Sequence, residues 1–152
     1  EMSKQNHMIQ KVYIVGDGID KGKIKSSSKK LVGFDVKVTG SLSREKLDQI
    51  YSKCHILILP SKSEGFPKVI AEAMSFGCVP IVTNVGSIGQ YINETNGVVL
   101  KDRSSYELEK AINFLLSDRS RIRELAQNSC KIDQKFSFEQ YNEKIKRLIL
   151  NL

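Results

Sequence analysis

Two glutamates separated by seven residues carry the clearest chemical potential in this sequence. Glu64 and Glu72 lie in the stretch SEGFPKVIAEAMSFGCVPIV, residues 63–82, with Pro67 between them. Carboxylates are strong hydrogen-bond acceptors for hydroxyl groups, which sugars and ribose carry. A helix that begins near Pro67 would present free backbone N–H groups, which attract phosphate. The stretch therefore predicts a site for a nucleotide sugar.

The elements that must position these glutamates can be predicted from the flanking residues. Residues 55–59 form an apolar run rich in branched side chains, which is typical of a strand buried on both faces of a parallel sheet. Pro67 predicts the first position of a helix that runs to Phe76, and Gly77 predicts the left-handed residue that ends it. Residues 79–83 predict the next strand. The loop of such a βαβ unit lies where open α/β sheets bind ligands.

Five strand candidates alternate with helical stretches along the whole chain. Alternation at this spacing predicts an α/β fold with a Rossmann-like parallel sheet of about five strands and helices on both faces. Beyond residue 100 the pattern is helical, with Ser104 or Ser105 as the first cap and a last helix over residues 138–152. No linker or repeat interrupts the chain, so residues 1–152 are predicted to form a single domain. The strand candidates are residues 11–16, 36–40, 55–59, 79–83 and 97–100.

The order of these motifs resembles the retaining glycosyltransferases of the GT-B fold, family 4. Glu64-Gly65-Phe66-Pro67 and Glu72 match the E-x7-E signature of that family. The flanking sequence ILILPSKSEGFPKVIAEAMSFGCVPIVTNVGSIGQYI follows the motif order of the family, as do VYIVGDG, VKVTGSLSREKL and NGVVL. The likeness spans roughly residues 11–140 and implies one half of a GT-B fold, the domain that binds the nucleotide-sugar donor.

The resemblance also implies a role for each matching residue. Glu64 would hold the hydroxyls of the donor sugar and is the expected catalytic residue, while Glu72 would bind the ribose. Other matching residues would line the donor sugar and its diphosphate: Gly65, Phe66, Pro67, Lys68 and Val69. A third group would face the base or close the same crevice: Gly40, Ser41, Gly16 and Gly18.

Three parts of the sequence depart from the family pattern. Ser87 stands where a second glycine is common, and Gly89-Gln90 stands where Pro-Glu is common. Residues 1–10 contain neither the Gly-Arg strand nor the Lys-Gly turn that the family places before its VGDG strand. The chain is therefore predicted to be the C-terminal part of a longer enzyme, without the N-terminal acceptor domain and the first strand and helix, and to be inactive alone.

The resemblance implies that the whole enzyme moves a sugar from a nucleotide-diphosphate sugar to a sugar or lipid-linked acceptor with retention of configuration. Cell-surface polysaccharide or glycolipid synthesis is the pathway that it suggests. No metal or other cofactor is expected, because by resemblance the helix dipole and basic residues stabilise the leaving diphosphate. The alternative is a non-catalytic nucleotide-binding or sugar-binding module, or a truncated paralogue of the same fold.

The net charge of +7 leaves several partners open. The densest basic cluster, KGKIKSSSKK at residues 21–30, is predicted to be a solvated surface or a peripheral membrane contact. Without interleaved aromatic residues it does not indicate nucleic-acid binding. No apolar run approaches the roughly 18 residues of a membrane span, and no signal peptide is visible. A cytoplasmic location is expected, with peripheral contact to the inner face of the plasma membrane as an extension of it.

Other residues with chemical potential are predicted to be structural. Asp17 is interpreted as a turn residue, and His55 as a core residue that opens a buried strand. Glu72 has its own structural alternative, an i,i+4 pair with Lys68 on the helix surface. The cysteines are odd in number and show no C-x-x-C spacing, so reduced structural thiols are predicted at Cys54, Cys78 and Cys130.

Overall fold

The structure, a computed structural model, describes residues 9–30, 33, 35–65, 67–131 and 146–147. Two compact units make up the chain, Glu1–Ile50 and Tyr51–Leu152, called here the first and the second unit. The second unit carries both glutamates of the E-x7-E signature. The first unit carries the glycine-containing loops that the resemblance assigns to the base and the crevice.

The first unit is a parallel strand pair with a helical crossover. β1 (Lys11–Val15) pairs with β2 (Asp35–Gly40), and α2 (Lys21–Ser28) connects them and contacts β2. Parallel strands require such a crossover, because a tight turn cannot bring two strands into the same direction. α3 (Arg44–Tyr51) follows β2 and ends at the first residue of the second unit.

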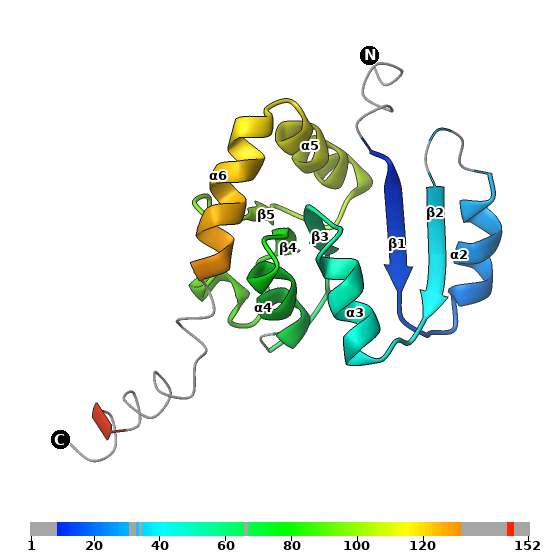
Figure 1. Cartoon of the computed structure of the whole chain (residues 1–152), viewed down its shortest axis with the longest axis horizontal. Helices are drawn as coiled ribbons and strands as arrows, with labels where there is room; N and C mark the ends of the chain where they lie inside the picture. Colours follow the sequence, from blue (N-terminus) through cyan, green and yellow to red (C-terminus); the bar gives the residue numbers. More distant parts are fainter. Residues whose placement is uncertain (1–8, 31–32, 34, 66, 132–145, 148–152) are drawn as a thin grey trace. The chain divides into compact units, whose positions relative to one another are not determined.

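The second unit is a three-stranded parallel sheet with β4 in the middle (Figure 1). Along the chain an α-helix follows each of the two outer strands, and the first of these helices completes the predicted βαβ unit. The strands are β3 (Ile56–Leu59), β4 (Val79–Thr83) and β5 (Val98–Leu100). The helical elements are α4 (Lys68–Ser75), η1 (Ile88–Gln90), α5 (Ser105–Leu116) and α6 (Arg119–Ser129).

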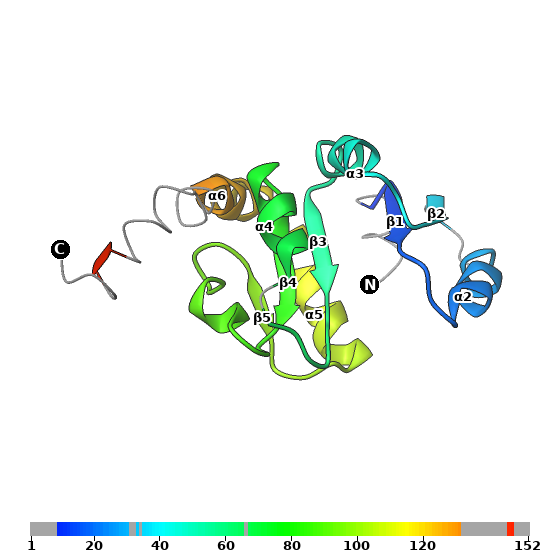
Figure 2. The same ribbon diagram turned by 90° about the horizontal axis from the view of Figure 1, so that it is seen from below.

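Two hydrophobic clusters lie on opposite faces of β4, which is buried along its whole length. On one face Val82 packs with Ile70 and Met74 of α4. On the other face Ile81 packs with Leu115 of α5 and with residues of α6. Successive strand residues point to opposite faces, so one strand serves both clusters. Figure 2 shows α4 and α5 on the two sides of the sheet. The predicted covering of the sheet on both faces is confirmed.

Each predicted strand is confirmed to within one residue at either end, and every recorded strand pair is parallel. The pairs form one sheet in each unit, β1–β2 and β3–β4–β5. The fold class is thus α/β with parallel sheets flanked by helices, as predicted.

The predicted helix ends are largely confirmed. Gly77 has φ +79° and follows α4, as its left-handed role requires. Ser104 caps α5 by accepting a 3.2 Å hydrogen bond from Glu107 N. Pro67, predicted as the first helical residue, is instead the extended residue before the helix, with ψ 122°. Most of the last predicted helix, residues 138–152, lies outside the described residues.

The prediction that His55 is a core residue is wrong. Its side chain is exposed because the strand begins one residue later, at Ile56. The three cysteines are unpaired, as predicted, and they differ in exposure. Burial raises the pKa of the Cys78 thiol to about 12, whereas Cys130 is exposed. A buried thiol with a raised pKa is inert, which fits a structural role for Cys78.

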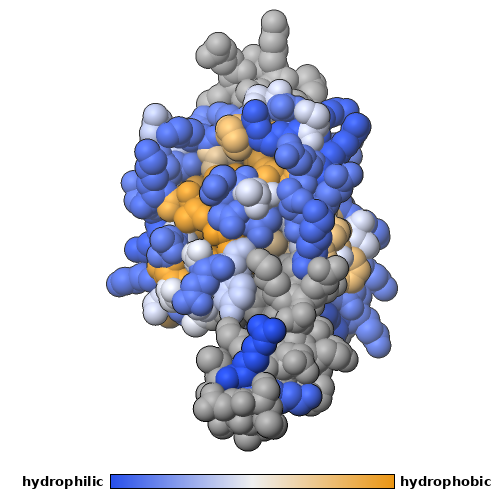
Figure 3. Space-filling view, turned by 90° about the vertical axis from the view of Figure 1, so that its left-hand side faces the viewer, coloured by the Kyte–Doolittle hydropathy of each residue, from blue (hydrophilic) through white to orange (hydrophobic). Residues whose placement is uncertain are grey.

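Hydrophilic side chains cover most of the face drawn in Figure 3, and hydrophobic ones show as a smaller area between them. Isolated exposed hydrophobic residues are normal on a folded protein. Within the described residues, no helix has the length and the apolar character that a membrane span needs.

Candidate functional site

Glu64 lies in the loop that follows β3, and the hydrogen bonds of this loop orient its carboxylate. Ser61 Oγ donates to Glu64 Oε1 at 2.9 Å. The carbonyl of Ser61 accepts a 2.6 Å hydrogen bond from the hydroxyl of Thr83, the buried last residue of β4. The Glu64 side chain is therefore half-buried and attached, through Ser61, to the end of the central strand.

The loop after β4 fixes the backbone on the other side of Glu64. Gly86 has φ +57°, and a Cβ atom there would lie 1.9 Å from Glu64 O and 2.5 Å from Gly65 O. No side chain fits between the two loops at this point. Ser87 donates from both its N–H and its hydroxyl to Gly65 O, at 3.1 and 3.2 Å. The serine that departs from the family pattern thus adds a hydrogen bond to the contact between the loops.

α4 begins directly after the loop that carries Glu64, and this helix supplies the second glutamate. The first N–H groups of a helix have no partner within it. At α4, Ile70 N is already bonded to Pro67 O at 3.0 Å, which leaves the N–H groups of Lys68 and Val69 to meet an anion. Glu72 is the fifth residue of the helix and is half-buried. The loop and the first turns of α4 therefore bring carboxylates and N–H donors into one short segment.

The turn between Glu64 and the helix is described in part. Gly65 is exposed and has open space around its Cβ position, and Pro67 is half-buried. Phe66, which the resemblance places at the donor, lies outside the described residues.

In the first unit, the loops after β1 and β2 meet at the carboxyl ends of the two strands. Gly16 N donates to Gly40 O at 3.0 Å. Both residues have positive φ, +128° at Gly16 and +80° at Gly40, so both positions favour glycine. The structure thus brings Gly16 together with Gly40, and the loop that contains Gly18 meets Ser41 through Asp17.

Asp17 is more than the turn residue that the sequence predicts. Its Oδ2 accepts a 2.6 Å hydrogen bond from Ser41 N, and its Oδ1 contacts the ammonium of Lys21. These bonds, first from Lys21 and then from Ser41, lower the pKa of Asp17 to about 2. A Cβ at Gly40 would lie 3.1 Å from the Asp17 carboxylate, so the glycine makes room for it. The sequence pattern that indicates these contacts of Asp17 is an acidic residue between two glycines after a strand, followed four residues later by a lysine.

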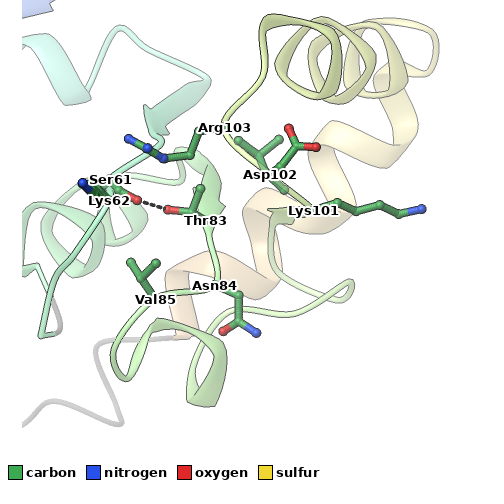
Figure 4. A pocket seen from close by; sticks show the side chains of 9 residues that line it. Ser61, Lys62, Thr83, Asn84, Val85, Lys101, Asp102 and Arg103 are labelled. Atoms are coloured by element: carbon green, nitrogen blue, oxygen red, sulfur yellow. Dashed lines mark hydrogen bonds between the residues drawn. The ribbon is translucent and has the colours of Figure 1, made fainter.

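A cavity that the sequence does not predict opens at the carboxyl ends of β3, β4 and β5 (Figure 4). Its volume is about 240 Å³. Three loops contribute to its lining, which includes Ser61, Lys62, Thr83, Asn84, Asp102 and Arg103. We call this site the strand-end cavity. Ser61 belongs both to this lining and to the hydrogen bond that orients Glu64.

Among residues 9–30, 33, 35–65, 67–131 and 146–147, no three His, Cys, Asp or Glu side chains lie together in a group that could hold a metal ion. The expectation that the enzyme needs no metal or cofactor stays a prediction.

Relatives of known class place this geometry in a family. The model of the family described as glycosyl transferases group 1 matches residues 1–132. An uncharacterized glycosyltransferase of Methanocaldococcus jannaschii is 31% identical over 135 residues, which are 84% of this chain and 36% of that protein. The N,N'-diacetylbacillosaminyl-diphospho-undecaprenol alpha-1,3-N-acetylgalactosaminyltransferase of Campylobacter jejuni is 27% identical over 115 residues, 72% of this chain and 31% of that protein. The chain thus spans about a third of the length of these curated relatives.

Solved structures show the same fold. HepE of Anabaena in complex with UDP superposes with a TM-score of 0.76 at 22% identity, over 98% of this chain and 44% of that one. Its complex with UDP-glucose gives a TM-score of 0.74. At this identity the likeness establishes the architecture. The chain belongs to the glycosyl transferases group 1 family, and its fold is that of the C-terminal domain of a GT-B glycosyltransferase.

Proposed function

We propose that this chain binds the donor in a glycosyltransferase that moves a sugar from a nucleotide-diphosphate sugar to an acceptor with retention of configuration. The observation that carries the proposal is the segment after β3, where an oriented carboxylate precedes the free N–H groups of a helix. The family match supports the transfer of a sugar. The structures of HepE with UDP and UDP-glucose show that a protein of this fold holds such a donor.

Each site residue has a role in this proposal. Glu64 accepts hydrogen bonds from the hydroxyls of the donor sugar, and Ser61 holds its carboxylate in place. Glu72 accepts hydrogen bonds from the ribose. The N–H groups of Lys68 and Val69 face the diphosphate, where the dipole of α4 favours negative charge. Gly65, Phe66 and Pro67 line the sugar and the diphosphate.

The residues of the first unit keep their proposed role toward the base and the crevice loop. Because Asp17 occupies the N–H of Ser41, a base would meet the side chain of Ser41 instead of its backbone donor. Gly40 and Gly16 have their backbones bonded to each other, and Gly18 follows in the same loop.

The chemical contribution of these residues is positioning and electrostatic stabilisation. Negative charge develops on the diphosphate as it leaves the anomeric carbon, and N–H donors already aimed at it lower the barrier. The acceptor hydroxyl loses its proton to a base outside this chain or to the donor phosphate itself. The acceptor is a sugar or a lipid-linked sugar in cell-surface polysaccharide or glycolipid synthesis. The Campylobacter jejuni relative, which is named for a diphospho-undecaprenol acceptor, supports this class.

Calorimetric titration of the 152-residue chain with UDP, GDP, ADP and their sugar conjugates tests the donor site. We expect one diphosphate to bind selectively. Glu72→Ala should weaken that binding by about tenfold or more, because a hydrogen bond to a charged group contributes roughly 1.5–3 kcal/mol. Glu94→Ala is the matched control, since Glu94 is an exposed carboxylate outside the site. Equal affinities for all three diphosphates would contradict selective recognition of the base. Equal losses in the two variants would contradict the ribose role of Glu72.

We also propose a peripheral contact between the basic segment of residues 21–30 and anionic lipid at the inner face of the plasma membrane. Lys21 and Lys23 pair with Asp17 and Asp20, whereas Lys25, Lys29 and Lys30 are exposed. Ile19, just before this segment, is fully exposed. A cluster of lysines with an exposed apolar side chain is a combination that attracts a protein to an anionic surface.

Cosedimentation with vesicles tests this contact. The chain should bind vesicles with anionic lipid and leave neutral vesicles in the supernatant. Joint replacement of Lys25, Lys29 and Lys30 by Gln should weaken binding about 100-fold, at about 1 kcal/mol for each lysine. Joint replacement of Lys46, Lys110 and Lys131, also exposed, is the control with the same change in charge. A similar loss in both triple variants would mean that only the net charge matters.

A further inference from the structure

We propose that the strand-end cavity binds a phosphate group of the acceptor, at a place separate from the donor diphosphate. The inference rests on the proposed function, because it assigns a second substrate to the same enzyme. The cavity lies at the carboxyl ends of β3, β4 and β5, whereas the N–H groups proposed for the donor diphosphate are at the start of α4.

Two cations from the loops after β5 and β3 give the cavity its character. Arg103 comes from the loop after β5, and its guanidinium reaches toward Ser61 and Lys62 in the loop after β3 (Figure 4). In the part of the chain that the structure describes, neither the Arg103 guanidinium nor the Lys62 ammonium has a hydrogen-bond or ion-pair partner. Two unpartnered cations that line one hollow attract an anion and raise its local concentration.

The carboxylate in the lining does not neutralise these cations directly. Asp102 Oδ1 accepts a 2.7 Å hydrogen bond from Ser104 N, at the start of α5. Hydrogen bonding from the hydroxyl and then the N–H of Ser104 lowers the pKa of Asp102. In Figure 4 its carboxylate points away from the guanidinium of Arg103. The carboxylate of Asp102 is thus bonded to Ser104 at the start of α5, and the face that Arg103 and Lys62 share stays basic.

The other walls combine polar residues with the apolar Val85 and Leu100, and a hydrogen bond fixes two of the loops. The hydroxyl of Thr83 donates to Ser61 O at 2.6 Å, so the loops after β3 and β4 are held together at the base of the cavity. Asn84, the next residue, is exposed, and its side-chain oxygen lies beside Gly89. Arginine binds phosphate through its planar fork, while lysine adds a compact charge. A guanidinium and an ammonium on a frame held by this hydrogen bond suit a phosphate group.

The size of the cavity suits a small group. Its volume of about 240 Å³ is below the roughly 300–1,000 Å³ of pockets that enclose a drug-sized molecule. A phosphate group fits this space. Ser61 lines the cavity and donates to Glu64, which the proposed function places at the donor sugar. A phosphate in the cavity would therefore lie beside the transferred sugar, where a phosphorylated acceptor must be.

NMR titration of the 15N-labelled chain with inorganic phosphate, a hexose 1-phosphate and UDP tests the proposal. We expect both phosphates to shift the backbone resonances of Lys62, Asn84 and Arg103 and to saturate. The hexose 1-phosphate should bind more tightly and displace inorganic phosphate. Arg103→Gln should raise the dissociation constant for both phosphates by about tenfold or more, as expected for a lost charged hydrogen bond. The affinity of the Arg103→Gln variant for UDP should stay unchanged.

Lys101→Gln is the matched control, because Lys101 is in the same loop and loses the same charge. Its ammonium points away from Arg103 and Lys62 in Figure 4, so phosphate affinity should change less than about twofold. Equal losses in the two variants, or no saturation, would overturn the cavity as a site. Binding of inorganic phosphate that excludes the hexose phosphate would overturn its assignment to the acceptor.

The outcome with UDP separates this inference from the proposed function. Loss of UDP binding in Arg103→Gln would overturn the separation of the two sites, because the cavity would then hold the donor diphosphate. If wild-type chain binds the phosphates at the cavity but binds none of the nucleoside diphosphates, the proposed donor site fails while the phosphate site stands.

Discussion

Glu64→Ala in the full-length enzyme should reduce kcat on the order of 10²–10³-fold, the loss that follows removal of one oriented transition-state contact. The carboxylate is half-buried and held by Ser61 at 2.9 Å, so it meets the donor sugar in one fixed orientation. Alanine removes every acceptor at that point. The measurement is steady-state transfer with the donor varied, which separates kcat from KM. Turnover near that of the wild type would remove Glu64 from the catalytic role.

Two further variants show how the carboxylate acts. Glu64→Gln keeps the shape and one acceptor oxygen, so it should retain more activity than the alanine variant if hydrogen bonding to the sugar is the role. Ser61→Ala removes the donor that orients the carboxylate. It should lower kcat by about tenfold, since a hydrogen bond to a charged group contributes roughly 1.5–3 kcal/mol. An equal loss in Glu64→Gln and Glu64→Ala would show that the charge itself is essential.

Gly86→Ala should destabilise the chain by about 2–5 kcal/mol, through the cost of a left-handed residue and of forced overpacking. The new Cβ would lie 1.9 Å from Glu64 O, and backbone atoms cannot rotate away as a side chain does. The loop that carries Glu64 must shift, so donor affinity should fall together with stability. Denaturant unfolding of the chain measures the first effect, and calorimetry with the selected diphosphate measures the second.

Gly65→Ala is the control for this variant, because Gly65 lies on the opposite side of the same contact. A Cβ at Gly65 meets nothing within 4 Å, and the expected change in stability is within about 0.5 kcal/mol. If the two alanine variants unfold at the same denaturant concentration, the close approach of the two loops is not what requires glycine at position 86.

Local sequence signals predicted the scaffold of the site well. β4 is apolar throughout and is buried throughout, so its run of residues could be read without tertiary information. Gly77 ends α4 because only a residue that tolerates positive φ fits there, and that requirement is local too. The E-x7-E spacing placed Glu64 in the loop and Glu72 on the helix for the same reason, since both positions follow from one strand and one helix start.

Features that depend on pairing could not be predicted in the same way. Asp17 and Ser41 are far apart in sequence, and they meet only because β1 and β2 pair in a particular register. The unpartnered state of Arg103 is also a tertiary property, because the strand-end cavity takes residues from three separate loops. The prediction for His55 was wrong for a different reason. An apolar run does not show at which residue the strand begins, and because β3 begins one residue later, the His55 side chain is exposed.

The hydroxyl of Ser61 has a single hydrogen, and in this structure Glu64 receives it. Toward the strand-end cavity the same oxygen can then offer only lone pairs, which an anion avoids. If a phosphate in the cavity takes the hydrogen, Glu64 loses the donor that holds its carboxylate. Glu64 at the donor site and the phosphate in the cavity would then compete for one hydrogen-bond donor, the hydroxyl of Ser61. Since linkage is reciprocal, acceptor phosphate should weaken donor binding by the same factor by which the donor weakens the binding of phosphate.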